Sequence, residues 1–594
     1  MDTILGIDLG TTNSVVSIFN NGTCQILEED GQKIVPSVVG LDANANLLVG
    51  FPALNQAALA PERTVRSIKR KMGSDETILL GNQAYAPQEI SAIILRTLKD
   101  RAARQMGREI RKAVITVPAF FHEQQREATR AAGELAGLDV VRIINEPTAA
   151  SLTYNPHGTG LERLLVYDLG GGTFDVSIVQ IEEGVVEVLA SHGDTQLGGD
   201  DFDQLLLDHV CGAFKEQHDV DPRESLVSKS RLLCAVEEAK KRLSFDAYAL
   251  IEEEFIAEKS GVPLHLKTEL ARIDYEALIE PLLNKTLVCV DEALSDAKLT
   301  ADKIDRVVLV GGASRTPLVR RLLSEQLGQP IHAEVDPDLC VSMGAAIQGG
   351  LIAGADVGPV LVDITPHTLG IACEGWLHSF RSQHRFAPLI HRNTPLPASR
   401  SEVFRTLADG QHVAAIEVYQ GEDEDARHNE QIGDFKLEGL ADVKAGNKVL
   451  VRFDLDLDGI LTVVTTEKAT GLEKRLKIEN VVSPSSKLER NESQARVEAA
   501  FGNETASEPE SPDQNESFAT ADDNLPPQWQ QAIAQAEDLI AKTDLLAAEA
   551  APQDANEMQQ LVQRLRQAIE ARSAEEVEQI SAKLDDLVFY LQDV

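Results

Sequence analysis

The stretch "VYDLGGGTFDVS", residues 166–177, decides how the first half of this chain folds. An apolar run ends at Asp168, three glycines and a threonine follow, and a second apolar run begins after Asp175. Nearly the same pattern occurs in "LGIDLGTTNSVV", residues 5–16, where Asp8 precedes the turn. Each copy predicts two strands joined by a small polar turn, and the two copies call for one common explanation.

The composition of these turns favours phosphate binding over a purely structural role. Glycines in a single hairpin could merely permit positive φ angles. Three in succession, Gly170, Gly171 and Gly172, exceed that need and let backbone N–H groups approach an anion. Asp8 and Asp168 would repel phosphate directly, but they could hold a hydrated Mg²⁺ that bridges to it. We therefore expect two lobes that close on one polyphosphate.

Neither common phosphate-binding motif is present in these turns. They contain no G-x-x-x-x-G-K-[ST] loop, and "GGGTFD" opens a strand rather than the helix of a dinucleotide-binding fold. A third glycine stretch, "LVGGASRTP" at 309–317, lies between a predicted strand and a predicted helix and could contact a ribose or base.

Composition and charge argue against several classes of function. The 594 residues include 95 acidic and 56 basic side chains, a net charge of −39 that disfavours nucleic-acid binding. No apolar run approaches the ~18 residues of a membrane span, and the start has no basic region typical of a signal peptide. The six cysteines are far apart, as in reduced proteins. We expect a cytoplasmic protein that binds neither nucleic acid nor membrane.

Changes in pattern divide the chain into three parts. Residues 1–356 alternate β-rich and helical runs, which is typical of an α/β domain. Within 449–463, apolar and polar side chains alternate from Val451 to Asp458, and Asp458–Gly459 supplies a turn, which predicts an antiparallel β domain. Residues 503–524 lack Lys and Arg and are rich in acidic residues, which predicts a disordered tether. An apolar stripe between 577 and 591 predicts a helix.

The order of ten motifs makes the chain resemble DnaK-type heat-shock chaperones of the 70-kilodalton class. The motifs are "GIDLGTTNS", "NEPTAAS", "YDLGGGTFDVSI", "GDTQLGGDDFD", "EEAKKRLS", "LVGGASRTP", "DITPHTLGI", "RNTPLP", "VYQGE" and "DLDGILTV". The resemblance implies a multidomain chaperone in which ATP binding and hydrolysis control binding and release of extended hydrophobic peptide segments. It implies an α/β actin-like (ribonuclease H-like) two-lobed ATPase over 1–356 and an apolar linker over 357–363. An antiparallel β-sandwich peptide-binding domain would span 364–485, and an α-helical lid region would span 486–594.

The resemblance also implies roles for individual residues in the ATPase domain, together with the cofactors ATP or ADP, Mg²⁺ and K⁺. Catalytic positions are Lys69, Glu146, Asp168 and Thr173. Metal positions, mostly acting through water, are Asp8, Asp168 and Asp175. Nucleotide-binding positions are Gly10, Thr11, Thr12, Asn13, Gly170, Gly171, Gly172, Thr173, Gly198, Gly199, Glu237, Lys240, Lys241, Ser244, Gly311, Gly312, Arg315 and Asp338.

In the β domain, the resemblance implies a channel for client peptides. The implied lining residues are Ile371, Phe404, Leu407, Ala414, Ile416 and Val418. Alternating apolar residues are usually ordinary core, and that alternative stays open. Glu374 and Leu407 stand where the family usually has Met and Ala, so we expect an altered arch over the channel, with Glu374 favouring basic residues beside the bound segment.

The resemblance assigns coupling between the domains to Pro147, Val360, Leu361 and Val362. An apolar connector makes sense if it docks on the ATPase domain in one nucleotide state, although it could instead be an edge strand of the β domain. A J-domain cochaperone is expected as a partner. The short segment 73–87 leaves the nucleotide exchange factor open and, with "RFAPLIHRNTPLP" at 385–397, favours the specialised HscC branch.

Three other functions share parts of this pattern. A sugar or acid kinase would need an acceptor site between the lobes and would not need a peptide domain. A filament-forming protein would not need the long β and helical extensions. A nucleotide sensor without hydrolysis would be expected to lack Lys69, Glu146 or Asp168, and all three are present.

Overall fold

The computed structural model describes residues 2–154, 160–331, 336–355, 360–377, 380–477 and 487–502, together with residues 562 and 564. The chain divides into two compact units, residues 1–507 and residues 508–594. The predicted tether at 503–524 and the predicted helix at 577–591 lie outside the described residues. Within those residues, no helix is long and apolar enough to cross a membrane.

The first hairpin lies in a six-stranded mixed sheet with the order β11-β10-β1-β2-β3, and β4 pairs with β2. β1 runs antiparallel to β2 and parallel to β10. The strands are β1 (Leu5–Leu9), β2 (Asn13–Asn20), β3 (Thr23–Ile26), β4 (Val35–Pro36), β10 (Lys112–Val117) and β11 (Asp139–Asn145). Apolar residues of this sheet form one core with helices α2 (Pro87–Met106) and α3 (Glu123–Leu135).

The second hairpin lies in a five-stranded sheet with the order β17-β12-β13-β14-β18. β12 runs antiparallel to β13 and parallel to β17, which repeats the arrangement around β1. The strands are β12 (Glu162–Leu169), β13 (Phe174–Glu182), β14 (Val185–Asp194), β17 (Arg306–Val310) and β18 (Val360–Val362). A second core joins this sheet to helices α5 (Gly199–His218), α6 (Leu226–Leu243), α7 (Arg272–Asp296) and α8 (Pro317–Leu327).

Two short helices, α4 (Glu146–Thr153) and α9 (Cys340–Ile352), share a third core with strands of both sheets. Their backbones pack closely, because a Cβ built on Gly344 would lie 1.8 Å from the carbonyl oxygen of Ala149. Smaller elements complete this region: α1 (Phe51–Ala57), β5 (Val39–Leu41), β6 (Leu47–Val49), β7 (Thr64–Val65), β8 (Ile78–Leu80), β9 (Gln83–Tyr85), β15 (Tyr248–Lys259) and β16 (Val262–Ala271).

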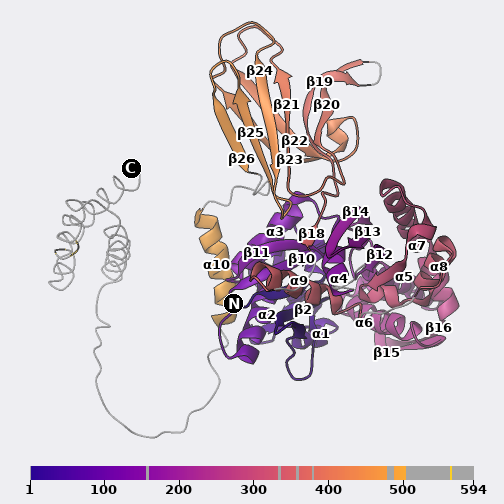
Figure 1. The fold of residues 1–594 in the computed structure, drawn as a ribbon. Coiled ribbons are helices and arrows are strands. Elements are labelled where there is room, and N and C mark those ends of the chain that lie inside the picture. Colours follow the sequence, from indigo (N-terminus) through magenta and orange to yellow (C-terminus); the bar gives the residue numbers. More distant parts are fainter. Residues whose placement is uncertain are drawn as a thin grey trace. The chain divides into compact units, whose positions relative to one another are not determined.

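The β domain consists of two four-stranded sheets, of order β20-β19-β22-β23 and β21-β24-β25-β26, that share one hydrophobic core (Figure 1). The strands of the first sheet are β19 (Leu369–Leu377), β20 (Phe380–Ile390), β22 (Val413–Gln420) and β23 (Glu430–Glu438). Those of the second are β21 (Ala398–Arg405), β24 (Lys448–Leu455), β25 (Leu461–Glu467) and β26 (Glu473–Lys477).

The predicted period-two strand is confirmed as β24, but it ends at Leu455 while the alternation continues to Leu457. The reason lies in Asp456, whose carboxylate accepts the N–H groups of Asp458 and Ile460 at 2.9 Å each. These bonds close a turn before the pattern runs out.

Helix α10 (Lys487–Phe501) packs against α2 of the first sheet's layer. Val497 belongs to the core that contains α2, and Arg496 forms an ion pair with the buried carboxylate of Glu89 at 2.7 Å. The guanidinium of Arg96 lies 4.3 Å from the ring centre of Phe501.

Candidate functional site

The turns of the two hairpins face each other across a cavity of about 420 Å³. A Cβ built on Gly171 would lie 1.9 Å from Oγ1 of Thr12, and one on Gly172 would lie 2.8 Å from Cγ2 of Thr11. Two turns that are more than 150 residues apart in sequence therefore meet. A cavity of this size, lined by polar groups from two lobes, suits a small charged ligand.

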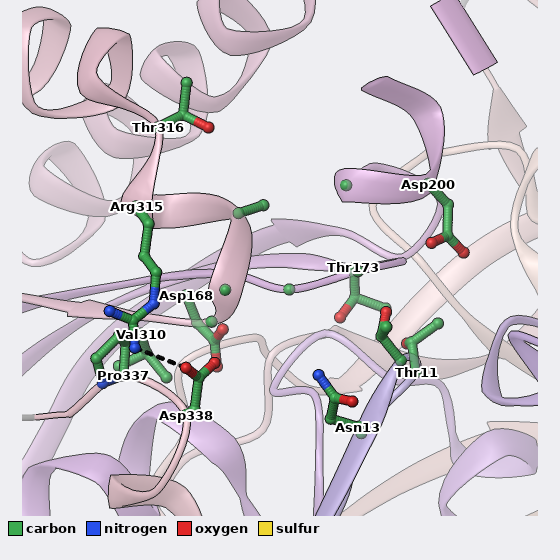
Figure 2. Close-up of a pocket in the computed structure, with 18 of the residues that line it drawn as sticks. Thr11, Asn13, Asp168, Thr173, Asp200, Val310, Arg315, Thr316, Pro337 and Asp338 are labelled. Carbon is green, nitrogen blue, oxygen red and sulfur yellow. Dashed lines mark hydrogen bonds and ion pairs between the residues drawn. The ribbon is translucent and has the colours of Figure 1, made fainter. Parts of the chain in front are cut away.

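Most of the predicted nucleotide and catalytic residues line this cavity, together with residues from α5, α6 and the loops after β17 (Figure 2). The predicted residues found there are Asp8, Gly10, Thr11, Thr12, Asn13, Lys69, Glu146, Asp168, Gly170, Gly171, Thr173, Gly199, Glu237, Lys240, Lys241, Ser244, Gly311, Gly312, Arg315 and Asp338.

Three predicted residues do not line the cavity. Gly172 faces the side chains of Arg70 and Thr11, and a Cβ on Gly198 would lie 2.5 Å from the backbone of Gly171. Gly198 therefore allows the glycine turn at 170–172 to pack against the start of α5. Asp175 lies behind the turn, where its carboxylate accepts the N–H of Phe120 at 2.9 Å.

Lys69 and Glu146 form a buried ion pair at the base of the cavity. Lys69 belongs to a short 3-10 helix, Ile68–Lys71, and its ammonium also lies 5.7 Å from the ring centre of Phe121. Glu146 is the first residue of α4. The two residues come from separate segments of the chain, so the fold rather than local sequence brings them together.

Carboxylates outnumber cations at the base of this cavity. Burial, reinforced by the charge of Glu146, raises the pKa of Asp8 to about 7 and that of Asp175 to about 7. The same causes raise the pKa of Asp168 well above its usual range. Lys69 opposes each shift, and Arg126 also opposes that of Asp175, but the pKa values stay raised. The carboxylates would therefore be ionised most readily with a further cation present.

These oxygen ligands fit Mg²⁺, which prefers carboxylates and keeps several of its waters. Within the described part of the chain, no three His, Cys, Asp or Glu residues lie close enough to ligate one ion directly.

The opposite end of the cavity is built from α6 and the loops after β17. The carboxylate of Glu237 accepts from Arg66 at 2.5 Å and pairs with Lys241 at 3.0 Å. Burial acts to raise its pKa, but the two cations lower it to about 2. Arg315 pairs with Asp338 at 2.6 Å (Figure 2). Charged side chains and the small residues Gly311 and Gly312 together line this end of the cavity.

Sequence reasoning missed several residues that line the cavity. Asp200 and Asp203 lie within the quoted motif "GDTQLGGDDFD", but acidic residues in the first turn of a helix are explained well enough by the helix dipole. The other missed residues are Phe245, Val310, Ala313, Thr316, Pro337 and Val341. None of these apolar or small residues carries a signal that separates it from ordinary core.

The predicted peptide-channel residues occupy the β domain. Ile371, Ile416 and Val418 are buried in its core, and Phe404 and Ala414 pack against that core. Leu407 is 58% exposed. The structure therefore brings five of the six residues together around one core and leaves Leu407 at the surface.

The linker residues Val360–Val362 form β18, which pairs in parallel with Val185, Val186 and Glu187 of β14. The segment is thus an edge strand of the second sheet and not of the β domain. Residue 363 follows directly, and the carboxylate of Asp363 accepts from Asn145 at 3.0 Å. Pro147 is buried in the first turn of α4, while Pro359 lies outside the described residues.

Further contacts join the β domain to the first part of the chain. Asp458, predicted only as a turn residue, forms ion pairs with Arg130 and Arg142 and accepts the N–H of Ile143. His367 contacts the carbonyl oxygen of Phe120 through Nε2 at 3.2 Å. These contacts connect the loop after β24 and the segment before β19 to the sheet that carries the first hairpin.

Comparison with known proteins gives this arrangement a family. A family model described as "Hsp70 protein" matches residues 4–78 and 75–593. The chain is 45% identical over 506 residues to "Chaperone protein DnaK" of Thermotoga petrophila and of Thermotoga maritima, covering 84% of this chain and 83% of each relative. It is 43% identical over 479 residues to the protein of the same name from Halobacterium salinarum, covering 80% of this chain and 75% of the relative.

Proposed function

The chain belongs to the Hsp70 family and is an ATP-dependent molecular chaperone with ATPase activity, and we propose that the cavity between the two hairpins is where it hydrolyses ATP. The observation that carries this proposal is the meeting of the two turns at Gly171 and Thr12. Such a geometry offers backbone N–H groups and hydroxyls to one polyphosphate from both sides.

We assign the chemistry to the charged base of the cavity. Phosphoryl transfer to water depends on positioning and charge neutralisation more than on covalent help. Lys69 would offset charge on the γ-phosphate, and Glu146, Asp168 and Thr173 would orient the attacking water. Mg²⁺ bound near Asp8, Asp168 and Asp175 would neutralise phosphate oxygens, with K⁺ as a second cation. Several carboxylates share the water, so no single general base is assigned.

We propose the finer architecture on the same basis. The two sheets with matching hairpins support an actin-like ATPase domain over 1–356, followed by a linker at 357–363. The two four-stranded sheets support a β-sandwich over 364–485 that binds extended hydrophobic segments of unfolded proteins. The helical region after 486 is proposed as a lid.

The coupling of the two domains is proposed to run through the joint around β18. ATP binding would hold Val360, Leu361 and Val362 against β14 and open the peptide channel; hydrolysis would release the linker and trap the client. The pairing of β18 with β14 supports this assignment. Pro147 lies in α4, next to the Asn145–Asp363 hydrogen bond.

The partners and the cellular compartment of the protein are predictions from its sequence and its family resemblance. We propose a J-domain cochaperone and leave the exchange factor open, because the short segment 73–87 folds into the small β8–β9 hairpin. Membership of the HscC branch is proposed on the sequence features named above. Six free cysteines support a reducing compartment such as the cytoplasm.

The test measures steady-state ATP hydrolysis and the dissociation of a fluorescent peptide, with and without ATP. Lys69→Ala and Thr173→Ala should each lower hydrolysis by about 100-fold or more. Lys71→Ala is the matched control, because Lys71 lies in the same 3-10 helix but pairs with Glu76 at the surface, at 2.7 Å. The proposal would be contradicted if Lys69→Ala hydrolysed ATP at the wild-type rate. It would also be contradicted if the wild-type protein released peptide at the same rate with and without ATP.

A further inference from the structure

Ser67 has an unusual backbone conformation for its residue type. Its φ of 53° and ψ of 32° lie in the left-handed region, which residues other than glycine and asparagine rarely adopt. Ser67 is also the residue that caps the 3-10 helix carrying Lys69. Its conformation therefore sets the direction in which the lysine enters the cavity.

The side chain of Ser67 crosses from one lobe to the other. Its hydroxyl donates to Oδ2 of Asp200 at 2.6 Å, a bond between residues 133 positions apart. Asp200 lines the cavity on the side of the second hairpin (Figure 2). Burial raises the pKa of this carboxyl, while the bond from Ser67 and nearby cations oppose the rise.

Asp200 is in turn fixed to the phosphate turn. Its backbone N–H donates to the carbonyl oxygen of Gly171 at 2.7 Å, and the N–H of Gly199 donates to Gly170 at 3.0 Å. One residue thus joins the lysine-bearing segment of the first lobe to the glycine turn of the second. Ser67 makes no side-chain capping bond to its own helix, so separation of the lobes would remove its bond to Asp200 without a replacement from that helix.

The neighbours of Ser67 also cross between the lobes, but they do not bond to the residue that holds the glycine turn. Arg66 pairs with Glu237 of α6, and Arg70 pairs with Asp201 at 3.2 Å and donates to the carbonyl oxygen of Gln196 at 2.9 Å. These bonds join the two lobes beside the cavity. The bond from Ser67 differs because Asp200 is anchored to Gly171.

We propose that Ser67 and Asp200 are a positioning pair that places Lys69 for hydrolysis only when the two lobes have closed. The hydroxyl–carboxylate bond holds Ser67 in its left-handed conformation and so aims the lysine at the γ-phosphate. An open cleft would bind nucleotide without this alignment. The inference rests on the proposed role of Lys69 and adds a residue pair that acts through it.

Single-turnover hydrolysis of bound ATP and equilibrium binding of ADP test this pair. A hydrogen bond to a charged group is worth enough to slow hydrolysis about tenfold or more in Ser67→Ala and in Asp200→Ala. ADP lacks the γ-phosphate, so its affinity should change by less than about threefold. The double variant should be no slower than the slower single variant, because both changes remove one interaction.

Conservative variants separate positioning from a structural role. Asp200→Asn keeps an acceptor oxygen and should recover most of the lost rate. Ser67→Gly adopts a left-handed backbone readily but lacks the hydroxyl, so it should be about as slow as Ser67→Ala. Ser74→Ala is the control: Ser74 donates to Lys71 in the same lobe at 2.8 Å, outside the cavity.

Two results would overturn the pair. Ser67→Gly hydrolysing ATP at the wild-type rate would show that the hydroxyl is not needed. If Ser67→Ala released ADP faster but hydrolysed ATP at an unchanged single-turnover rate, the Ser67–Asp200 bond would only retain nucleotide and would not position Lys69. Lys69→Ala, run alongside, keeps the underlying assignment separate: wild-type hydrolysis there defeats the role of Lys69 itself, whereas a slow Lys69→Ala beside a fast Ser67→Ala defeats only the pair.

Discussion

The two hairpins share one backbone plan but differ in what their turns carry. The turn after β1 presents Thr11, Thr12 and Asn13, and the turn after β12 presents three glycines. The difference is complementary, because a Cβ on Gly171 would fall 1.9 Å from Oγ1 of Thr12. The glycines therefore leave room for the threonines of the other lobe, and under the proposed function they would also expose N–H groups to phosphate.

The hairpins also differ in how they connect to the β domain. The sheet of the second hairpin accepts β18 at its edge, and Asp175 binds the N–H of Phe120, whose carbonyl oxygen contacts His367. Among the residues that the structure describes, the strands and turn of the first hairpin make no hydrogen bond to the β domain. The sheet of the first hairpin and its helix α3 meet the β domain through Arg142 and Arg130, which pair with Asp458, whereas the linker strand β18 pairs with the sheet of the second hairpin. We therefore expect the second sheet to report on bound nucleotide through β18.

The substitution Gly171→Ala tests most strongly whether the second turn needs glycine to leave room for Thr12 of the first. We expect ATP hydrolysis to fall about 100-fold, because the new methyl group would hold the two turns apart by an ångström or more. Gly170→Ala is the matched control, since the nearest atom to its Cβ would be 3.6 Å away. Its loss should be about ten times smaller. Equal losses in the two variants would contradict the steric explanation.

Complementarity also predicts a rescue. Thr12→Ala removes the oxygen that lies closest to the new methyl group of Gly171→Ala, although Cβ of Thr12 would still be 3.2 Å away. We expect the double variant to hydrolyse ATP about tenfold faster than Gly171→Ala alone. Steady-state hydrolysis of the four proteins forms a double-mutant cycle. Additive losses would show that the turns act independently.

The reporting role of the second hairpin is tested at β18. Leu361→Asp places a carboxylate on a partly buried strand that packs against the core between the two sheets. Burial of a charge is unfavourable, so the linker should undock and ATP should speed peptide release about tenfold less. Val403→Asp makes the same change at a β-domain residue that is 40% exposed. Full ATP stimulation in Leu361→Asp would remove β14 from the signalling route.

The smallest expected effect concerns the route through Phe120 and His367. Burial lowers the pKa of His367 to about 3, with His122, Arg126 and His192 acting in the same direction. A solvated histidine titrates near pH 6.5, so it binds a proton when the joint opens. Lowering the pH from 7.5 to 6.0 should therefore favour the open joint by about fourfold through this residue.

The variant His367→Leu isolates that contribution. Glu123 lies in the same joint, and burial raises its pKa to about 8, so acid favours the closed joint through this carboxyl in both proteins. The contribution of Glu123 therefore cancels when the pH dependence of the closed fraction in His367→Leu is subtracted from that in the wild type. Interdomain fluorescence transfer against pH measures the closed fraction, with His265→Leu on β16 as the control. Parallel pH curves for His367→Leu and wild type would argue against this route.

Sequence alone was sufficient where the signal is local. Apolar runs that end at Asp8 and Asp168 predict strands because side-chain burial and turn chemistry act over a few residues. The long-range partners were not predictable in that way. Ser67 and Asp200 are 133 positions apart, and an acid in a first helical turn already has a local explanation. Asp458 was predicted as a turn residue, and nothing nearby signals its arginine partners.

The β domain shows a different limit. Core residues and channel residues both alternate with polar ones, so the pattern at Ile416 and Val418 could not separate the two roles. The structure buries both residues in the core, and their part in peptide binding stays a prediction. A pattern of period two reports which face is covered, but not by what.

The turn at Asp458 and Gly459 has an evolutionary consequence. As a bend between two strands it could be replaced by Asn–Gly at little cost to folding. The same carboxylate, however, lies between Arg130 and Arg142 of another domain. A substitution at Asp458 could therefore abolish coupling between the two domains while each domain still folds. Selection at this position would then act on interdomain coupling rather than on the stability of either domain.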